Sequence, residues 1–69
     1  MRVKVLHAWS GGHRRAYDLH WRDSHGLAHW QRIGVPCDCD WNRRFAREAL
    51  DVLEHVYGLK RRNIRFNVV

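Results

Sequence analysis

Apolar and polar residues alternate along the first third of the chain, and this period of two predicts strands. Over 2–10, Val3 and Val5 share one face of the extended chain. Over 14–23 apolar and polar side chains again lie on opposite faces, and the pair Gly11-Gly12 between the two runs is typical of a tight hairpin turn. The expected core face of the second run consists of Tyr17, Leu19 and Trp21. We therefore expect a β-hairpin that buries one face.

The segment 27–35 lacks a clean period, and two interpretations compete for it. As a strand, it presents Trp30 on the face that points away from the core. As a short helix capped by Ser24, it pairs Leu27 with Trp30 instead. We favour the strand, which ends at Pro36.

A helix is the strongest structural signal in the sequence. Asp40 is a suitable N-cap, Gly58 suits the left-handed position after a helix, and Leu59 supplies the apolar residue that often follows it. Opposite charges four residues apart predict two surface ion pairs, Arg44–Glu48 and Arg47–Asp51. The apolar stripe that must be buried consists of Phe45, Ala46, Ala49, Leu50, Val52, Leu53, Val56 and Tyr57.

The chain ends in another alternating run. Over 63–69, we expect Ile64, Phe66 and Val68 to point inward. The predicted order is therefore β-β-β-α-β, a single α+β domain over residues 1–69 in which one amphipathic helix covers one face of a mainly antiparallel sheet. The other face of that sheet is left open.

Composition adds a strong positive charge to this picture. Thirteen lysine and arginine residues oppose seven carboxylates, which gives a formal net charge of +6. That balance favours an anionic partner such as nucleic acid. The excess of arginine over lysine fits phosphate binding, and it fits equally well the codon usage of a GC-rich genome. No apolar run approaches the ~20 residues of a membrane span, so we expect a cytoplasmic protein that does not associate with membranes.

The open sheet face is the leading candidate for a binding site. Arginines there can neutralise phosphates, and an exposed tryptophan can stack on an unpaired base. A three-stranded sheet packed on one helix resembles, in layout only, the DNA-reading domains of AP2-type plant factors and the arm-binding domains of phage integrases, although the additional terminal strand departs from their pattern. The residues predicted for this face are Lys4, Arg14, His20, Arg22, Trp30, Arg32 and Arg65.

A second basic cluster follows the helix. Arg61 and Arg62, next to Lys60, are further candidates for phosphate contacts. Cations at a helix C-terminus also oppose the helix dipole, and this structural role is the stronger expectation for them.

The sequence supports a binding domain better than an enzyme. We predict a small non-enzymatic nucleic-acid-binding domain of phage or mobile-element type, with DNA favoured over RNA. One alternative is a phage-type effector that binds a host protein through its arginines and tryptophans and forms a homodimer by strand pairing. Another is a metal-independent, toxin-like ribonuclease that uses His7, His13 and His20 if they converge.

Cofactor sites are weakly indicated. His25 and His29 precede Cys37 and Cys39, and these are residue types that bind zinc. The Cys-x-Cys spacing is shorter than that of most zinc sites, so we predict no metal and no cofactor. Neighbouring cysteines of this kind also exclude a stabilising intrachain disulfide framework.

Overall fold

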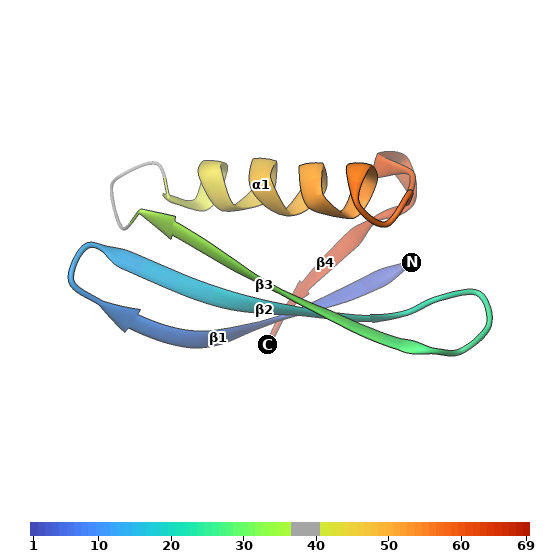
Figure 1. Ribbon diagram of the computed structural model, residues 1–69, viewed down its shortest axis with the longest axis horizontal. Coiled ribbons are helices and arrows are strands. Elements are labelled where there is room, and N and C mark those ends of the chain that lie inside the picture. Colours follow the sequence, from blue (N-terminus) through green and yellow to red (C-terminus); the bar gives the residue numbers. More distant parts are fainter. Residues whose placement is uncertain (37–40) are drawn as a thin grey trace.

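A computed structural model describes residues 1–36 and 41–69, apart from the side chain of Trp41. It confirms the predicted α+β order, with one helix packed on a mixed four-stranded sheet (Figure 1). The segment 27–35, for which a short helix was the alternative, forms a strand. The elements are β1 (Arg2–Gly11), β2 (Arg14–Arg22), β3 (Ala28–Pro36), α1 (Trp41–His55), the 3₁₀ helix η1 (Arg61–Asn63) and β4 (Arg65–Val68).

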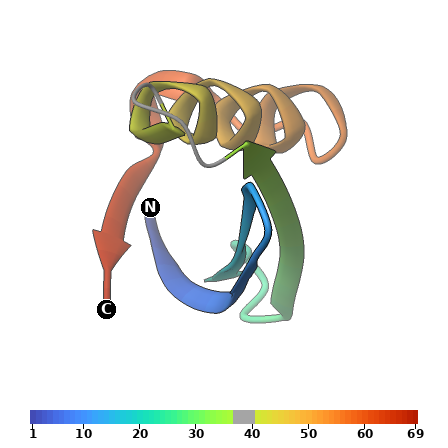
Figure 2. The same ribbon diagram turned by 90° about the vertical axis from the view of Figure 1, so that its left-hand side faces the viewer.

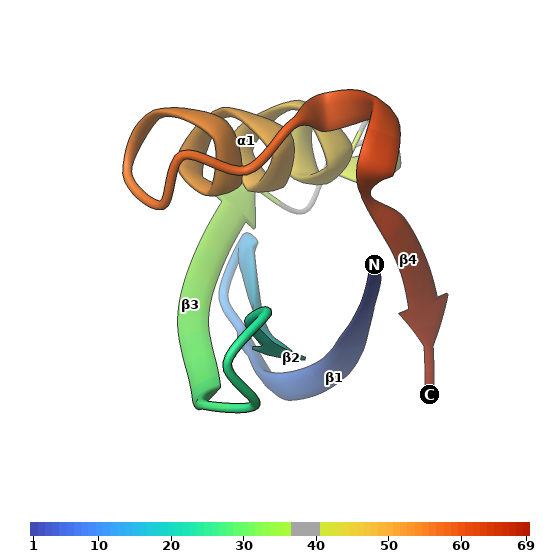
Figure 3. The ribbon, with the colours of Figure 1, turned by 90° about the vertical axis from the view of Figure 1, so that its right-hand side faces the viewer.

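The strands lie in the order β3-β2-β1-β4. Antiparallel hairpins join β1 to β2 and β2 to β3, whereas β4 pairs with β1 in parallel. A parallel pairing requires a long crossover connection, and α1 provides it by carrying the chain from one edge of the sheet to the other. The sheet curves strongly, with its concave side toward α1 (Figures 2 and 3).

The core lies between α1 and one face of the sheet. The alternation in β1 and β2 buries Val3, Val5 and Leu19 as predicted, because these residues share the side of the strands that points toward the helix. From α1, Phe45, Ala49 and Leu53 pack against them. The remaining buried residues of this cluster are Tyr17, Trp21, Ile33, Val35 and Ile64.

The predicted end of the helix is confirmed. Gly58 has a φ of 70°, a left-handed conformation that favours glycine. The amide of Leu59 donates to the carbonyl of Leu53 at 3.0 Å, and the amide of Gly58 donates to that of Glu54 at 3.1 Å. The bond from Gly58, four residues back to Glu54, is that of an αL C-cap, and both bonds satisfy carbonyls that the end of the helix leaves without a partner. The predicted N-cap, Asp40, lies outside the described residues.

Two residues expected in the core are exposed. Val56 is 68% exposed, because it follows the last residue of α1 and lies in the turn that leads to Gly58. Val68 is 76% exposed, because β4 is a short edge strand that leads away from α1 (Figure 3). The prediction that both would be buried was wrong.

One of the two ion pairs predicted on the helix, Arg47–Asp51, differs from the prediction. In the described part of the chain, Asp51 pairs not with Arg47 but with Arg61, at 3.1 Å. The same guanidinium bonds Glu54 at 3.2 Å. Arg61 can reach both carboxylates because the left-handed turn at Gly58 brings η1 back to the end of the helix.

A β-bulge in β1 changes which residues face the core. The β1–β2 register shifts between His7 and Trp9, so that Trp9 lies opposite Ala16 and Ala8 is the additional residue. The bulge therefore places Trp9 on the same face as Lys4, which strict alternation from Val5 does not predict. A hydrogen bond of 2.6 Å between the side chains of His7 and Ser10 is consistent with both lying on the opposite face.

Candidate nucleic-acid interface

The sheet face opposite α1, called here the open face, contains the predicted basic residues. The strand register determines this arrangement: His20 lies opposite Lys4 on one side and Trp30 on the other, and Arg65 lies opposite Arg2. Seven residues predicted for this face share it, namely Lys4, Arg14, His20, Arg22, Trp30, Arg32 and Arg65. The sheet therefore gathers side chains from four strands on one surface.

One arginine of the open face is already neutralised. Arg32 donates from Nε to Oδ1 of Asp18 at 2.8 Å and from Nη2 to Oδ2 at 3.1 Å, a bidentate pair between facing positions of β2 and β3. These bonds lower the pKa of Asp18 below its ordinary value and raise that of Arg32. Arg32 is thus less available to bind an anion than the sequence alone indicated.

The other cations of the face keep most of their donors available. Arg22 donates to the carbonyl of Gly26 at 2.8 Å, and Arg65 donates to the carbonyls of Arg62 and Ile64 at 3.2 Å. These are neutral acceptors, so both guanidinium groups keep their full charge. Lys4, Arg14 and Arg2 form no ion pair with any residue that the structure describes.

Two tryptophans are exposed on this charged surface. Trp30 is 60% exposed in the edge strand β3, and the guanidinium carbon of Arg32 lies 6.0 Å from its ring centroid. Trp9 is 46% exposed, and the bulge places it on the open face near Gly11. A planar ring among arginines can stack on a base while the cations contact phosphates.

The second basic cluster does not join the open face. Arg61 forms ion pairs with Asp51 and Glu54 at the end of α1, which agrees with the structural role that we expected for this cluster. The carbonyl of Arg62 accepts a bond from Arg65, and the Arg62 side chain is exposed in η1. Arg61 is therefore no longer a candidate for contacts to phosphate, and Arg62 is a candidate only at the edge of the open face, next to Arg65.

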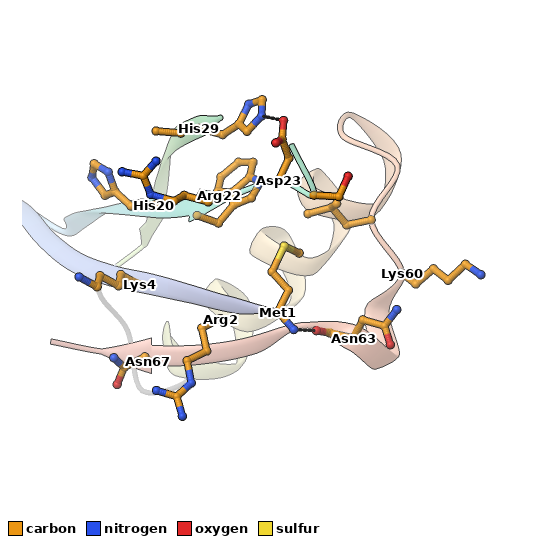
Figure 4. Close-up of a pocket in the computed structure, with 14 residues that line it drawn as sticks. Met1, Arg2, Lys4, His20, Arg22, Asp23, His29, Lys60, Asn63 and Asn67 are labelled. Atoms are coloured by element: carbon orange, nitrogen blue, oxygen red, sulfur yellow. Dashed lines mark hydrogen bonds and ion pairs between the residues drawn. The ribbon is translucent and has the colours of Figure 1, made fainter. Parts of the chain in front are cut away.

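A hollow of about 920 Å³ lies at one end of the sheet. Its lining includes Lys4, His20 and Arg22 from the open face, and the apolar side chains of Met1, Trp21 and Leu59. Figure 4 shows Lys4, His20 and Arg22 along one side of the hollow, whereas Lys60 points away from it.

The rim of the hollow contains a hydrogen-bonded pair, His29 and Asp23, set in an aromatic cluster. Nε2 of His29 lies 2.8 Å from Oδ2 of Asp23, and Oδ1 of Asp23 accepts the backbone amides of His25 and Leu27. The His29 side chain and these amides hold the pKa of Asp23 below its ordinary value. The His29 ring stacks on Trp21 at 5.5 Å. This network fixes the β2–β3 turn.

The histidines proposed for ribonuclease chemistry do not converge. His7 lies opposite Tyr17, on the side of the sheet that faces α1, whereas His20 lies on the open face. His13 is in the turn between β1 and β2. The structure thus separates His7 from His20 by the thickness of the sheet.

The metal hypothesis gains no support. Within residues 1–36 and 41–69, no group of three or more histidine, cysteine or acidic side chains is placed to hold a metal ion. His29 is instead paired with Asp23, and Cys37 and Cys39 lie outside the described residues.

Sequence reasoning missed two members of the open face. Arg2 has the same parity as Lys4, so the alternation of β1 could have identified it. Trp9 carries no such signal, because its position depends on the bulge.

Comparisons with known proteins identify no relative: no family model, no curated protein and no solved structure matches the chain. Among the residues that the structure describes, no helix has the length and apolar character needed to cross a membrane.

Proposed function

We propose that this protein is a non-enzymatic domain that binds nucleic acid, with single-stranded DNA as the preferred form, through its open face. The observation that carries the proposal is the 60% exposed ring of Trp30 on a face shared by arginines and Lys4. Stacking on a tryptophan requires an unpaired base, so the ring favours a single strand over a duplex.

The charges of the face set the expected salt dependence. If Lys4, Arg14, Arg22 and Arg65 each contact one phosphate, counterion release at about −0.7 per contact gives a slope of about −2.8 in log K against log salt. A fourfold rise in salt should then weaken binding roughly fifty-fold. A protein partner held by an aromatic hot spot would produce a much shallower slope.

The test is fluorescence anisotropy with labelled single-stranded DNA, duplex DNA and RNA at two salt concentrations. The variant is the double substitution Arg14→Ala/Arg22→Ala. The control is Arg43→Ala/Arg47→Ala, which removes the same charge from exposed positions of α1. Salt-sensitive binding that the first variant loses and the control retains would support the proposal.

Two results would overturn it. Equal losses in both double variants would mean that net charge alone attracts the strand, without a site. Absence of binding at low salt would reject nucleic acid and favour the effector that binds a host protein.

A further inference from the structure

The hollow arises where the sheet divides into two halves. The register between β1 and β2 begins at Lys4 and His20. Beyond that pair, Arg2 of β1 pairs with Arg65 of β4, and Arg22 of β2 pairs with Ala28 of β3. We call this place the strand split.

Positive charge gathers at the strand split. Arg2, Lys4 and Arg22 all line the hollow and come from the two strands that part there. Among the described residues, these three side chains make one hydrogen bond, from Nη1 of Arg22 to the carbonyl of Gly26 at 2.8 Å. Figure 4 shows Lys4 and Arg22 on one side of the hollow, whereas the Arg2 side chain is directed away from both. Lys4 and Arg22 repel one another, and a multiply charged anion between them would relieve this repulsion.

The acidic residue in the same lining does not compensate these cations. Asp23 already accepts the backbone amides of His25 and Leu27 through Oδ1, and its Oδ2 lies 2.8 Å from His29. Figure 4 shows the pair of Asp23 and His29 at the rim, apart from Arg2 and Lys4. The cationic side of the hollow is therefore free to receive an anion.

The rest of the hollow suits an organic group attached to that anion. Met1, Trp21 and Leu59 contribute apolar surface, and Asn63 and Asn67 contribute amides that can bind polar atoms. A volume of about 920 Å³ lies within the range of ~300–1,000 Å³ typical of small-molecule sites. A nucleoside with a phosphate fits this combination of charge, apolar surface and size.

We propose that the strand split binds a nucleoside phosphate monoester, and specifically the terminal phosphate of a nucleic-acid strand lying on the open face. The inference rests on the proposed function, because Lys4, His20 and Arg22 belong to both surfaces. A terminal monoester carries more negative charge than an internal diester, and it can enter a hollow that a continuous strand must pass by. The protein would thus recognise the end of a strand.

The experiment compares oligothymidylates that are identical except at their ends. Anisotropy titrations use a strand with a 5′-phosphate, a strand with a 3′-phosphate and a strand with hydroxyl groups at both ends. We expect one phosphorylated strand to bind about tenfold more tightly than the hydroxyl-ended strand, as new hydrogen bonds to a charged group imply. Which end gives the gain defines the polarity of the bound strand.

The variants locate the preference. Lys4→Gln should abolish the gain from the terminal phosphate, Lys4→Arg should retain part of it, and Arg47→Ala at an exposed position of α1 should retain all of it. Circular dichroism checks that each variant is folded. A gain that survives in Lys4→Gln would overturn the inference.

The remaining outcomes separate the inference from the proposed function. Equal affinity for phosphorylated and hydroxyl-ended strands would overturn the inference while the function stands. If no strand binds, the proposed function fails. A titration with thymidine monophosphate, followed by NMR, then tests whether the hollow binds a free nucleotide, which carries the same phosphate monoester. Shifts of the Lys4 and Trp21 signals would then support a free nucleotide as the ligand, and their absence would reject the site.

Discussion

Replacing Trp30 with alanine should weaken binding without unfolding the protein. The ring is 60% exposed and faces His20 across the strands, so its removal costs a cross-strand contact worth about 0.2–1 kcal/mol of folding free energy. Stacking on a base contributes about 1–3 kcal/mol to binding. The affinity for single-stranded DNA should therefore fall roughly 5- to 150-fold while the melting temperature changes little.

Trp21 provides the contrast. It is 5% exposed, stacks on His29 at 5.5 Å and meets the ring of Tyr57 at 4.9 Å. Trp21→Ala should cost about 3–5 kcal/mol. A 69-residue domain has about 3–10 kcal/mol of stability at the usual value per residue, so this variant should lose much or all of its fold.

The assay pairs anisotropy with urea denaturation on wild type, Trp30→Ala and Trp30→Phe. The phenylalanine variant keeps an aromatic face, so it should recover most of the affinity. Unchanged affinity in Trp30→Ala would refute the stacking argument. A loss of stability of several kcal/mol in Trp30→Ala would refute the assignment of this ring to the binding surface.

Three further predictions concern stability. Leu53→Ala should cost about 3–5 kcal/mol in urea denaturation, because the side chain is fully buried between α1 and the sheet, and a smaller loss would mean that the core collapses around the cavity. Gly58→Ala should cost roughly 1–2 kcal/mol through the left-handed φ of 70° alone, since the space around it is empty, whereas Gly34→Ala, with no such backbone conformation, should cost less. The bond from His29 lowers the pKa of Asp23 below 3.8, so this carboxylate stabilises the fold above pH 3.8 and that contribution is lost as the pH falls through the lowered pKa. Asp23→Asn should therefore lower the melting temperature at neutral pH, and a difference that does not shrink below pH 3.8 would contradict this cause.

The sequence predicted the faces of the strands well where the alternation is regular. Val3, Val5, Tyr17 and Leu19 are buried as expected, because strand geometry places alternate residues on opposite sides whatever the pairing order. The same parity placed the basic side chains on the open face.

The residues that differ from the prediction do so for local reasons that the alternation of apolar and polar positions does not contain. The bulge at Ala8 reverses the side on which Trp9 lies, and Val68 is exposed because β4 is a short edge strand that leads away from α1 (Figure 3). The strand split was beyond sequence reasoning for another reason. It depends on which strands are neighbours, and the alternation of a strand contains no information about its partner.

The parallel pairing of β1 with β4 has a consequence for how the domain folds. The two hairpins of the sheet join segments that are close in the chain, whereas Arg2 pairs with Arg65, which lies far from it in the sequence. Pairing β4 with β1 closes a loop that contains almost the whole chain, and this costs conformational entropy. The hydrogen bonds of a strand of only four residues offset that cost directly, so we expect β4 to dock last. Until it does, β1 is an unpaired edge, and the amides of Asn63 and Asn67 are not yet in place around the hollow. The domain thus completes its candidate binding site in the same late step that completes its sheet.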